Sequence, residues 1–189
     1  MTPISTGSKL ITDIDHSIIF LLNSLSLYAR THSEHINCVY YLAEVRWARY
    51  QLSKEKQDLD KSIVHCTDAI FLPPVSRDGS VLNNVFQLLL HLAFALLERS
   101  ENFEQPEGVK YSIEYLRYLR GLPLDPFDLR IPRILVTASL IRALGVQVES
   151  DAGGGTQNIK EMVVLCRELL ISDTESLTSA DFPIDPFNP

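Results

Sequence analysis

The sequence predicts an all-α fold, built as a stack of about three helical hairpins with one leading helix. Three observations support this prediction. Apolar residues recur at three- and four-residue spacing along most of the chain, while strand-like alternation is nearly absent. Segments of the chain also match one another at an offset of fifty residues. Finally, prolines follow the helical segments at points where a hairpin would end.

About seven helices are expected, and local start and stop signals set their limits. Pro73-Pro74 ends the third, Ser80 caps the fourth, and Pro106 and Pro132 open the fifth and sixth. A polar loop is expected over 100–105. The helices cover residues 8–30, 33–53, 57–72, 80–99, 106–121, 132–145 and 156–171. Together they form a single helical-repeat domain over 1–172, followed by an irregular, proline-containing tail over 173–189.

The internal repeat is the main support for a stacked architecture. At the fifty-residue offset the matching pairs include Leu42-Ala43 with Leu92-Ala93, Ser62-Ile63 with Ser112-Ile113, and Leu72-Pro73 with Leu122-Pro123. A further fifty residues place Val163 opposite Ile113, and residues 13–18 echo residues 58–63. One hairpin cannot bury its apolar face alone, so stacked hairpins are expected to share a core. A non-repetitive bundle with chance matches is the alternative.

Within each unit the pattern resembles the tetratricopeptide repeat. Leu42-Ala43 and Leu92-Ala93 look like that family's Leu-small pair, and Ser62, Cys66, Ala69 and Pro74 look like its second-helix positions. The resemblance implies a right-handed solenoid of about three hairpins whose first helices line a concave groove. The consensus Trp, Gly and Tyr are not in place, and the loop within each hairpin is expected to be about seven residues longer than usual.

A second resemblance covers residues 58–173. The segments 59–63, 103–106, 115–123 and 156–162 look like repeat regions of uncharacterised proteins from mushroom-forming fungi, which often precede a caspase-like CHAT protease domain. The chain matches only the repeat part of such proteins. This resemblance implies a helical scaffold or regulatory arm without proteolytic activity.

The tetratricopeptide resemblance also indicates where a partner binds. The equivalent groove positions are Asn37, Tyr41, Glu44, Gln87, His91 and Phe94. For each of them, packing between helices is an equally good interpretation. Relatives that grip a terminal carboxylate use Lys or Arg, whereas Glu44, Ala48, Phe94 and Glu98 stand at the matching positions here. We therefore expect an apolar or basic helix or extended peptide as the partner.

No catalytic residue, metal site or cofactor is expected. His32, His35 and Cys38 have zinc-binding side chains, but their spacing spreads them around most of a helical turn. The glycine-rich segment 153–155 has no P-loop lysine. Cys66 follows His65 directly, and adjacent helical residues point about 100° apart, so a core thiol is the better interpretation.

Composition narrows the class further. The chain is 46% hydrophobic and 22% charged, with a net charge of −7, which disfavours nucleic acid and anionic membranes as partners. Three widely spaced cysteines suggest a reducing compartment, and we expect a cytoplasmic protein with buried free thiols. Three hypotheses therefore remain: a non-enzymatic protein-interaction scaffold, an all-α enzyme or small-ligand protein with an inter-helix pocket, and the repeat arm of a larger protein. The apolar run 18–22 also suggests self-association through exposed helix ends.

Overall fold

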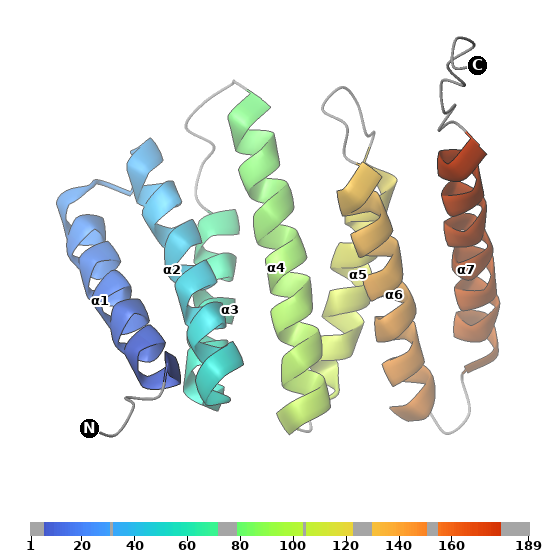
Figure 1. The fold of residues 1–189 in the computed structure, drawn as a ribbon, viewed down its shortest axis with the longest axis horizontal. Coiled ribbons are helices and arrows are strands. Elements are labelled where there is room, and N and C mark those ends of the chain that lie inside the picture. Colours follow the sequence, from blue (N-terminus) through green and yellow to red (C-terminus); the bar gives the residue numbers. More distant parts are fainter. Residues whose placement is uncertain are drawn as a thin grey trace, which may run out of the picture. The chain divides into compact units, whose positions relative to one another are not determined.

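A computed structural model describes residues 6–30, 32–71, 79–103, 105–122, 130–150 and 155–178 (Figure 1). These residues form seven helices and no strand, which confirms the all-α prediction for this part of the chain. The helices are α1 (Thr6–Leu27), α2 (Ser33–Ser53), α3 (Lys56–Ile70), α4 (Gly79–Phe103), α5 (Glu107–Gly121), α6 (Arg130–Ser150) and α7 (Gly155–Thr178).

The contacts divide the chain into two compact units, Met1–Pro123 and Leu124–Pro189, where the sequence predicted one domain over 1–172. The first unit holds α1 to α5 and the second holds α6 and α7. The boundary falls in the proline-containing segment between α5 and α6, most of which lies outside the described residues.

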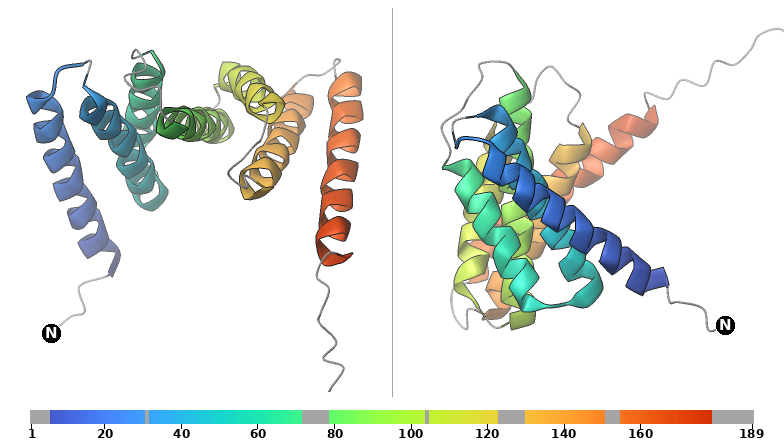
Figure 2. Two further views of the ribbon diagram at one scale, coloured as in Figure 1. Left: turned by 90° about the horizontal axis from the view of Figure 1, so that it is seen from above. Right: turned by 90° about the vertical axis from the view of Figure 1, so that its left-hand side faces the viewer.

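In the first unit each helix packs against the next one in the chain. Figures 1 and 2 show α2 and α4 in one layer, with α3 and α5 behind them and α1 beside α2. The unit therefore contains two hairpins, α2–α3 and α4–α5, preceded by α1. In each hairpin we call the earlier helix the first helix and the later one the second helix.

The fifty-residue repeat is real in this unit, because the two second helices bury equivalent residues. Those of α3 are Asp58, Leu59, Ser62, Ile63, Cys66 and Ala69, and those of α5 are Gly108, Val109, Ser112, Ile113, Leu116 and Leu119. An equivalent hydrogen bond in each hairpin fixes how the first helix is aligned along the second. Ser62 Oγ donates to the Ala43 carbonyl at 2.9 Å, and Ser112 Oγ donates to the Ala93 carbonyl at 2.8 Å. Alanine permits this approach because a larger side chain would hold the helices apart.

The two hairpins differ at one end of the repeat. Buried Asp58 accepts a hydrogen bond from Arg46 Nη1 at 2.9 Å and a second from Arg49 Nη1. The equivalent position of α5 is Gly108, where an added Cβ would lie 2.4 Å from Ser100 Oγ and 2.8 Å from the Leu96 carbonyl oxygen. The first hairpin therefore joins its helices here by ion pairs, and the second by a close backbone approach.

Several predicted boundaries are wrong in the same direction, because the helices run further than expected. α4 continues to Phe103 through the predicted polar loop, α6 continues past Gly145 to Ser150, and α7 reaches Thr178 within the predicted tail. Polar residues alone do not end a helix, and an isolated glycine such as Gly145 weakens a helix without necessarily ending it. The expected long loop inside each hairpin is also wrong. Only Lys54 and Glu55 separate α2 from α3, with Lys54 in the left-handed conformation at φ 57°.

The second unit keeps part of the repeat. Ala143 is fully buried at the position of Ala43 and Ala93, but the serine position carries Met162 instead. A Cβ on Gly145 would lie 3.8 Å from Met162 Cε, so α6 and α7 are close at this level. Val163, aligned by sequence with Ile113, is 45% exposed, whereas Ile113 is 2% exposed. Further sequence matches, such as Leu72-Pro73, lie outside the described residues.

Candidate functional site

The six residues predicted to line a groove fall into different environments. On α2, Tyr41 is 55% exposed, while Asn37 and Glu44 are half-buried. On α4, His91 is buried, and Gln87 and Phe94 are half-buried. Of these six residues, the structure joins Glu44 and His91 by a hydrogen bond, and Tyr41 opens onto a different surface. A side chain that is buried between helices cannot by itself present a binding surface.

His91 lies at the centre of a polar cluster between α2, α3 and α4. Its Nδ1 lies 2.7 Å from Glu44 Oε1, and its Nε2 lies 3.1 Å from Ser62 Oγ. Trp47 contacts the imidazole edge-on, with ring centroids 5.3 Å apart. The hydrogen bond from His91 is the main reason that the pKa of Glu44 is lowered from its usual value of 4.5.

The order Ser62, His91, Glu44 has the connectivity of a hydrolytic triad, yet the surroundings favour a structural role. Ser62 is 0% exposed, so no substrate reaches its oxygen. Its proton is directed to the Ala43 carbonyl, the bond that Ser112 repeats in the next hairpin. A serine whose single proton is already donated to the backbone, in a site closed to solvent, joins helices and does not act as a nucleophile.

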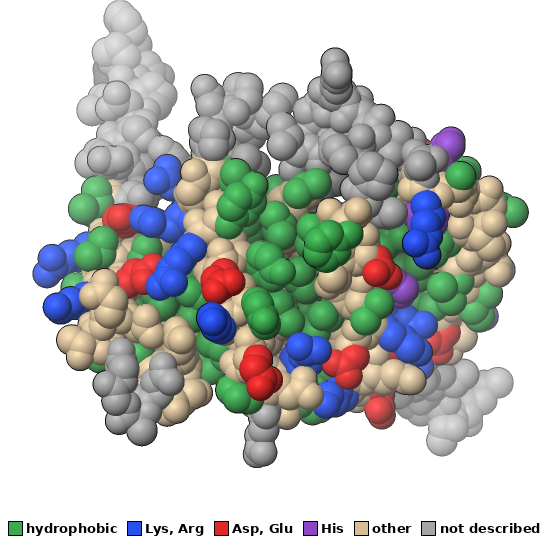
Figure 3. All heavy atoms as spheres, turned by 180° about the vertical axis from the view of Figure 1, so that it is seen from behind, with side chains coloured by type: hydrophobic (Ala, Val, Ile, Leu, Met, Phe, Trp, Pro, Cys, Tyr) green, Lys and Arg blue, Asp and Glu red, His purple; other side chains and the backbone are tan. Residues whose placement is uncertain are grey.

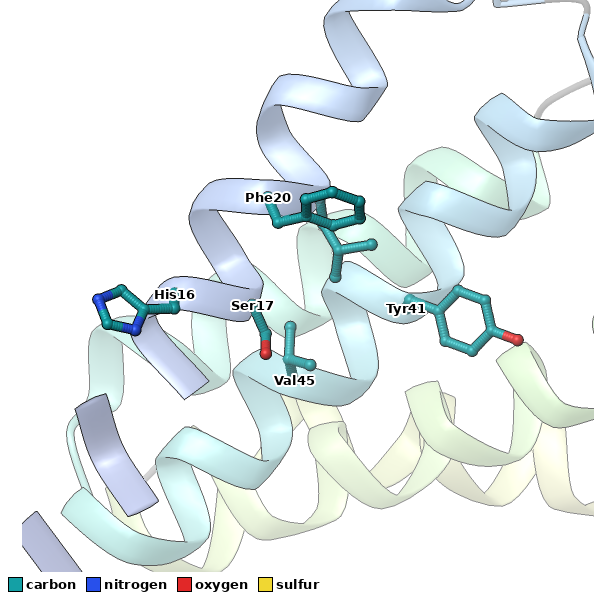
Figure 4. Close-up of a pocket in the computed structure, with 6 residues that line it drawn as sticks. His16, Ser17, Phe20, Tyr41 and Val45 are labelled. Carbon is teal, nitrogen blue, oxygen red and sulfur yellow. The ribbon is translucent and has the colours of Figure 1, made fainter. Parts of the chain in front are cut away.

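An open surface lies between α1 and α2, and Figure 4 shows most of the residues around it. It is a hollow of about 460 Å³, which we call the α1–α2 hollow. Its lining consists of His16, Ser17, Phe20 and Leu21 from α1 with Tyr41 and Val45 from α2. Ser17 of α1 and Val45 of α2 lie close together, and the rings of Phe20 and Tyr41 extend from α1 and α2 beside them (Figure 4). Phe20 is 70% exposed, so two large aromatic side chains face solvent across this hollow.

Local interactions hold α1 against α2 and so position the hollow. Asp15 Oδ1 accepts a hydrogen bond from Arg49 Nε at 2.7 Å, and the side chain of Ile18 on α1 is buried, with 5% exposed. At the other end of α1, Tyr28 stacks on His32 with ring centroids 5.1 Å apart. Burial of a few residues along one side of α1 leaves the opposite apolar side uncovered. Phe20 is exposed on that side, and Ile19 and Leu22 are exposed elsewhere on α1.

The residues weighed as zinc ligands and as a reactive thiol have other surroundings. His32 Nδ1 accepts from the Glu34 amide at 3.1 Å and caps α2. Cys66 is fully buried, as predicted, and burial raises the pKa of its thiol to about 12. All three cysteines are free, but Cys166 is exposed, which corrects the expectation that every thiol is buried.

A second hollow of about 300 Å³ lies at the other end of α1, between it and the α2–α3 hairpin. It is lined by Leu25, Arg30, His35, Val39, His65, Asp68 and Phe71. Burial is the main cause that lowers the pKa of His65. Cationic and anionic groups are mixed in its lining, and His35 Nδ1 lies 3.2 Å from the Tyr28 carbonyl oxygen. This lining selects neither an anion nor a cation.

The face on the side of α3 and α5 is chemically mixed. Figure 3 shows hydrophobic side chains there among both charge signs. Tyr111 and Tyr118 of α5 are exposed, as is Val64 of α3. Within the described residues, Lys9–Leu27 of α1 is long and apolar enough to cross a membrane by length and composition. The α1–α2 hollow has two exposed aromatic side chains, Phe20 and Tyr41, and no Lys, Arg, Asp or Glu in its lining. The second hollow has one exposed aromatic side chain, Phe71, beside Arg30 and Asp68.

The chain matches no family model, and neither a curated protein nor a solved structure is similar to it.

Reasoning from the sequence found Tyr41 but missed the α1 side of the hollow. Two signals pointed to it: the apolar run 18–22, and the echo of residues 58–63 by residues 13–18. The first suggested self-association, and the second served only as support for the repeat. Together they indicate that α1 is equivalent to α3, the second helix of a hairpin. The surface that is exposed on α1 is covered on α3.

Proposed function

We propose that this chain is a non-enzymatic protein-interaction scaffold that binds an apolar or basic helix or extended peptide at the α1–α2 hollow. The observation that carries the proposal is the exposure of Phe20 and Tyr41 on a concave surface of a helical repeat. Aromatic side chains make strong anchors because they bury a large area while fixing few rotatable bonds. The resemblance to tetratricopeptide-like repeat arms of fungal proteins agrees with this role.

The enzyme and small-ligand alternative has weaker support. Its best catalytic arrangement, Ser62 with His91 and Glu44, is closed to substrate, and the 300 Å³ hollow mixes charges of both signs. The repeat-arm alternative is compatible with a scaffold, since a repeat arm binds partners through the same surfaces. The three free cysteines support a reducing, cytoplasmic setting as part of this proposal.

The test is a partner pull-down with a variant that combines Phe20→Ala and Tyr41→Ala. We expect it to lose a defined set of partners while its circular dichroism spectrum is unchanged, because both side chains are exposed. Tyr118→Ala is the matched control, since Tyr118 is 59% exposed on α5 and lies outside the hollow. Retention of every partner by the folded double variant would contradict the proposed binding surface.

A further inference from the structure

The α1–α2 hollow has a counterpart inside the first unit that is already filled. The echo between residues 13–18 and 58–63 aligns Ser17 with Ser62 and Leu21 with Cys66. The fifty-residue repeat aligns Tyr41 with His91 and Val45 with Ala95. Four of the six lining positions therefore have counterparts at the contact of α3 with α4, and the pair Ser17 and Ser62 keeps its residue type. Phe20 aligns with His65, which lines the second hollow instead.

In that counterpart a third helix, α2, covers the site. Ser62 donates to the Ala43 carbonyl, and His91 contacts Glu44 and Trp47. Cys66, Ala95 and Ala43 are members of one hydrophobic cluster. Four of the equivalent positions are consequently closed, with Ser62, Cys66 and Ala95 each 0% exposed and His91 9% exposed.

Around α1 the same positions are open. Ser17 is exposed and its Oγ turns back to the Asp13 carbonyl of its own helix at 3.0 Å. Tyr41 is 55% exposed, whereas His91 at the equivalent position is 9% exposed. Ile18 is buried like Ile63, so the side of α1 that faces the following helix is already packed. The uncovered side is the one that a first helix covers in both complete hairpins.

We propose that the α1–α2 hollow binds an arginine-bearing amphipathic helix of a partner protein, which packs on α1 as α2 packs on α3. The inference rests on the proposed scaffold function and names the partner class. The partner helix carries a small residue where it crosses Ser17, so that its backbone carbonyl accepts the serine hydroxyl. An aromatic side chain four positions later, equivalent to Trp47, packs near Tyr41.

The carboxylate of Asp13 specifies the charge of this helix. Asp13 is exposed and aligns with Asp58, which binds Arg46 and Arg49, three and six positions after Ala43. In the second hairpin the aspartate is replaced by Gly108, and the position three after Ala93 is the apolar Leu96. The Asp58 and Arg46 positions therefore both change in the second hairpin, to Gly108 and Leu96. The Arg49 position keeps its arginine as Arg99, which pairs with Asp60. Asp13 selects the arginine-bearing type of helix.

This chain offers the probe itself, a fluorescein-labelled peptide with the sequence of α2, residues 33–53. Fluorescence anisotropy with the full-length protein is expected to show saturable binding. Ser17→Leu should weaken it about tenfold or more, because a larger side chain blocks the close approach of the backbones. Ser26→Leu is the matched control, since Ser26 is an exposed α1 serine whose Oγ also turns to its own helix, at the Asn23 carbonyl.

A double-mutant cycle tests the charge assignment. Asp13→Ala should weaken binding of the native peptide about threefold to tenfold, and should have no effect on a peptide carrying Arg46→Ala and Arg49→Ala. The proposal would be overturned if Ser17→Leu left the affinity of the peptide unchanged. It would also be overturned if Asp13→Ala weakened both peptides equally. A peptide that displaced α2 from its own place in the protein would bind equally well to the Ser17→Leu variant, and would therefore overturn the proposal.

Other occupants give distinct results, each of which overturns the proposal. A second copy would appear as a dimer in sedimentation velocity that Ser17→Leu dissociates. A membrane would appear as co-sedimentation of the protein with phosphatidylcholine vesicles, with α1 as the inserted segment. If the peptide fails to bind while Phe20→Ala with Tyr41→Ala still loses partners, the scaffold function stands and only the helix assignment fails.

Discussion

The α1 and α3 helices carry the same short pattern in two different environments. Asp13 and Ser17 of α1 are exposed, whereas Asp58 and Ser62 at the equivalent positions of α3 are almost fully buried. The difference lies in the third helix, because α2 covers α3 and the described residues provide no such cover for α1. The same residue types therefore join two helices in α3 and are exposed to solvent in α1.

The comparison teaches how to find a binding surface in a repeat protein. Apolar exposure alone does not identify such a surface, since scattered exposed apolar residues are common on proteins. A stronger criterion is a position that is filled in one repeat and open in the next, with its polar groups still in place. The first three predictions below compare the two members of an equivalent pair, and the last compares one residue of the closed site at two pH values.

Thiol reactivity gives the largest expected difference. Burial raises the pKa of Cys66 from 9.0 to about 12, which lowers its thiolate fraction at pH 8 by about a thousandfold. Leu21 is the equivalent position in the open hollow, so Leu21→Cys should react with Ellman's reagent about a thousandfold faster than Cys66. Mass spectrometry after short labelling should find the introduced thiol and exposed Cys166 modified, with Cys66 intact. Rapid labelling of native Cys66 would show that its site opens.

Removal of the buried carboxylate comes next. Asp58→Ala should lower the free energy of unfolding by about 3 kcal/mol, because two arginines lose their buried partner. Asp13→Ala should change it by less than about 0.5 kcal/mol, since Asp13 is exposed. Urea unfolding followed by the fluorescence of Trp47, the single tryptophan, measures both in the first unit. Equal losses would mean that the two aspartates have the same environment.

The serine pair should show a smaller effect. Ser62→Ala should cost about 1–2 kcal/mol, because the Ala43 carbonyl and His91 Nε2 each lose a buried hydrogen-bond partner. Ser17→Ala should cost less than about 0.5 kcal/mol, since its hydroxyl is exposed to water. The same unfolding measurement compares them. Ser112→Ala provides an internal check, with a loss near 1 kcal/mol for its single bond to the Ala93 carbonyl.

Acid sensitivity of the closed site should give the smallest effect. The hydrogen bond from His91 lowers the pKa of Glu44 below 4.5, so the folded state favours the carboxylate. Its contribution to stability is complete above the unfolded-state value of 4.5 and is lost as pH falls through the lower folded value. Urea unfolding at pH 6 and at pH 3 should show a stability deficit of Glu44→Gln that is larger at pH 6. An equal deficit at both pH values would mean that the protonation of Glu44 does not contribute to the loss of stability in acid.

The fold was largely predictable because its signals are local or periodic. Helical spacing located all seven helices, and the match of Ser62 with Ser112 predicted that the two positions are equivalent. The structure adds that both hydroxyls donate to a backbone carbonyl, of Ala43 and of Ala93. Boundaries were less predictable. The polar residues before Phe103 resemble a loop in composition, yet they remain helical because no proline or glycine interrupts them.

The site was predictable only in part. Resemblance to a repeat family placed Tyr41 and His91 on one groove, since they occupy equivalent positions. Their exposures differ because the neighbours of α4 are complete, whereas those of α2 are not. Equivalence in sequence defines what a position can contact, but the presence of the third helix decides whether it does.

The sequence by itself determined the all-α class, the fifty-residue period of the first unit and the residue types at the helix joints. These properties follow from side-chain periodicity and from the small residues that close helix packing requires. Only the tertiary structure decided that Ser62 is closed and Ser17 is open, and that Phe20 and Tyr41 line one exposed hollow. Burial depends on which helices surround a side chain, and that information is not carried by the residue or its near neighbours in the chain.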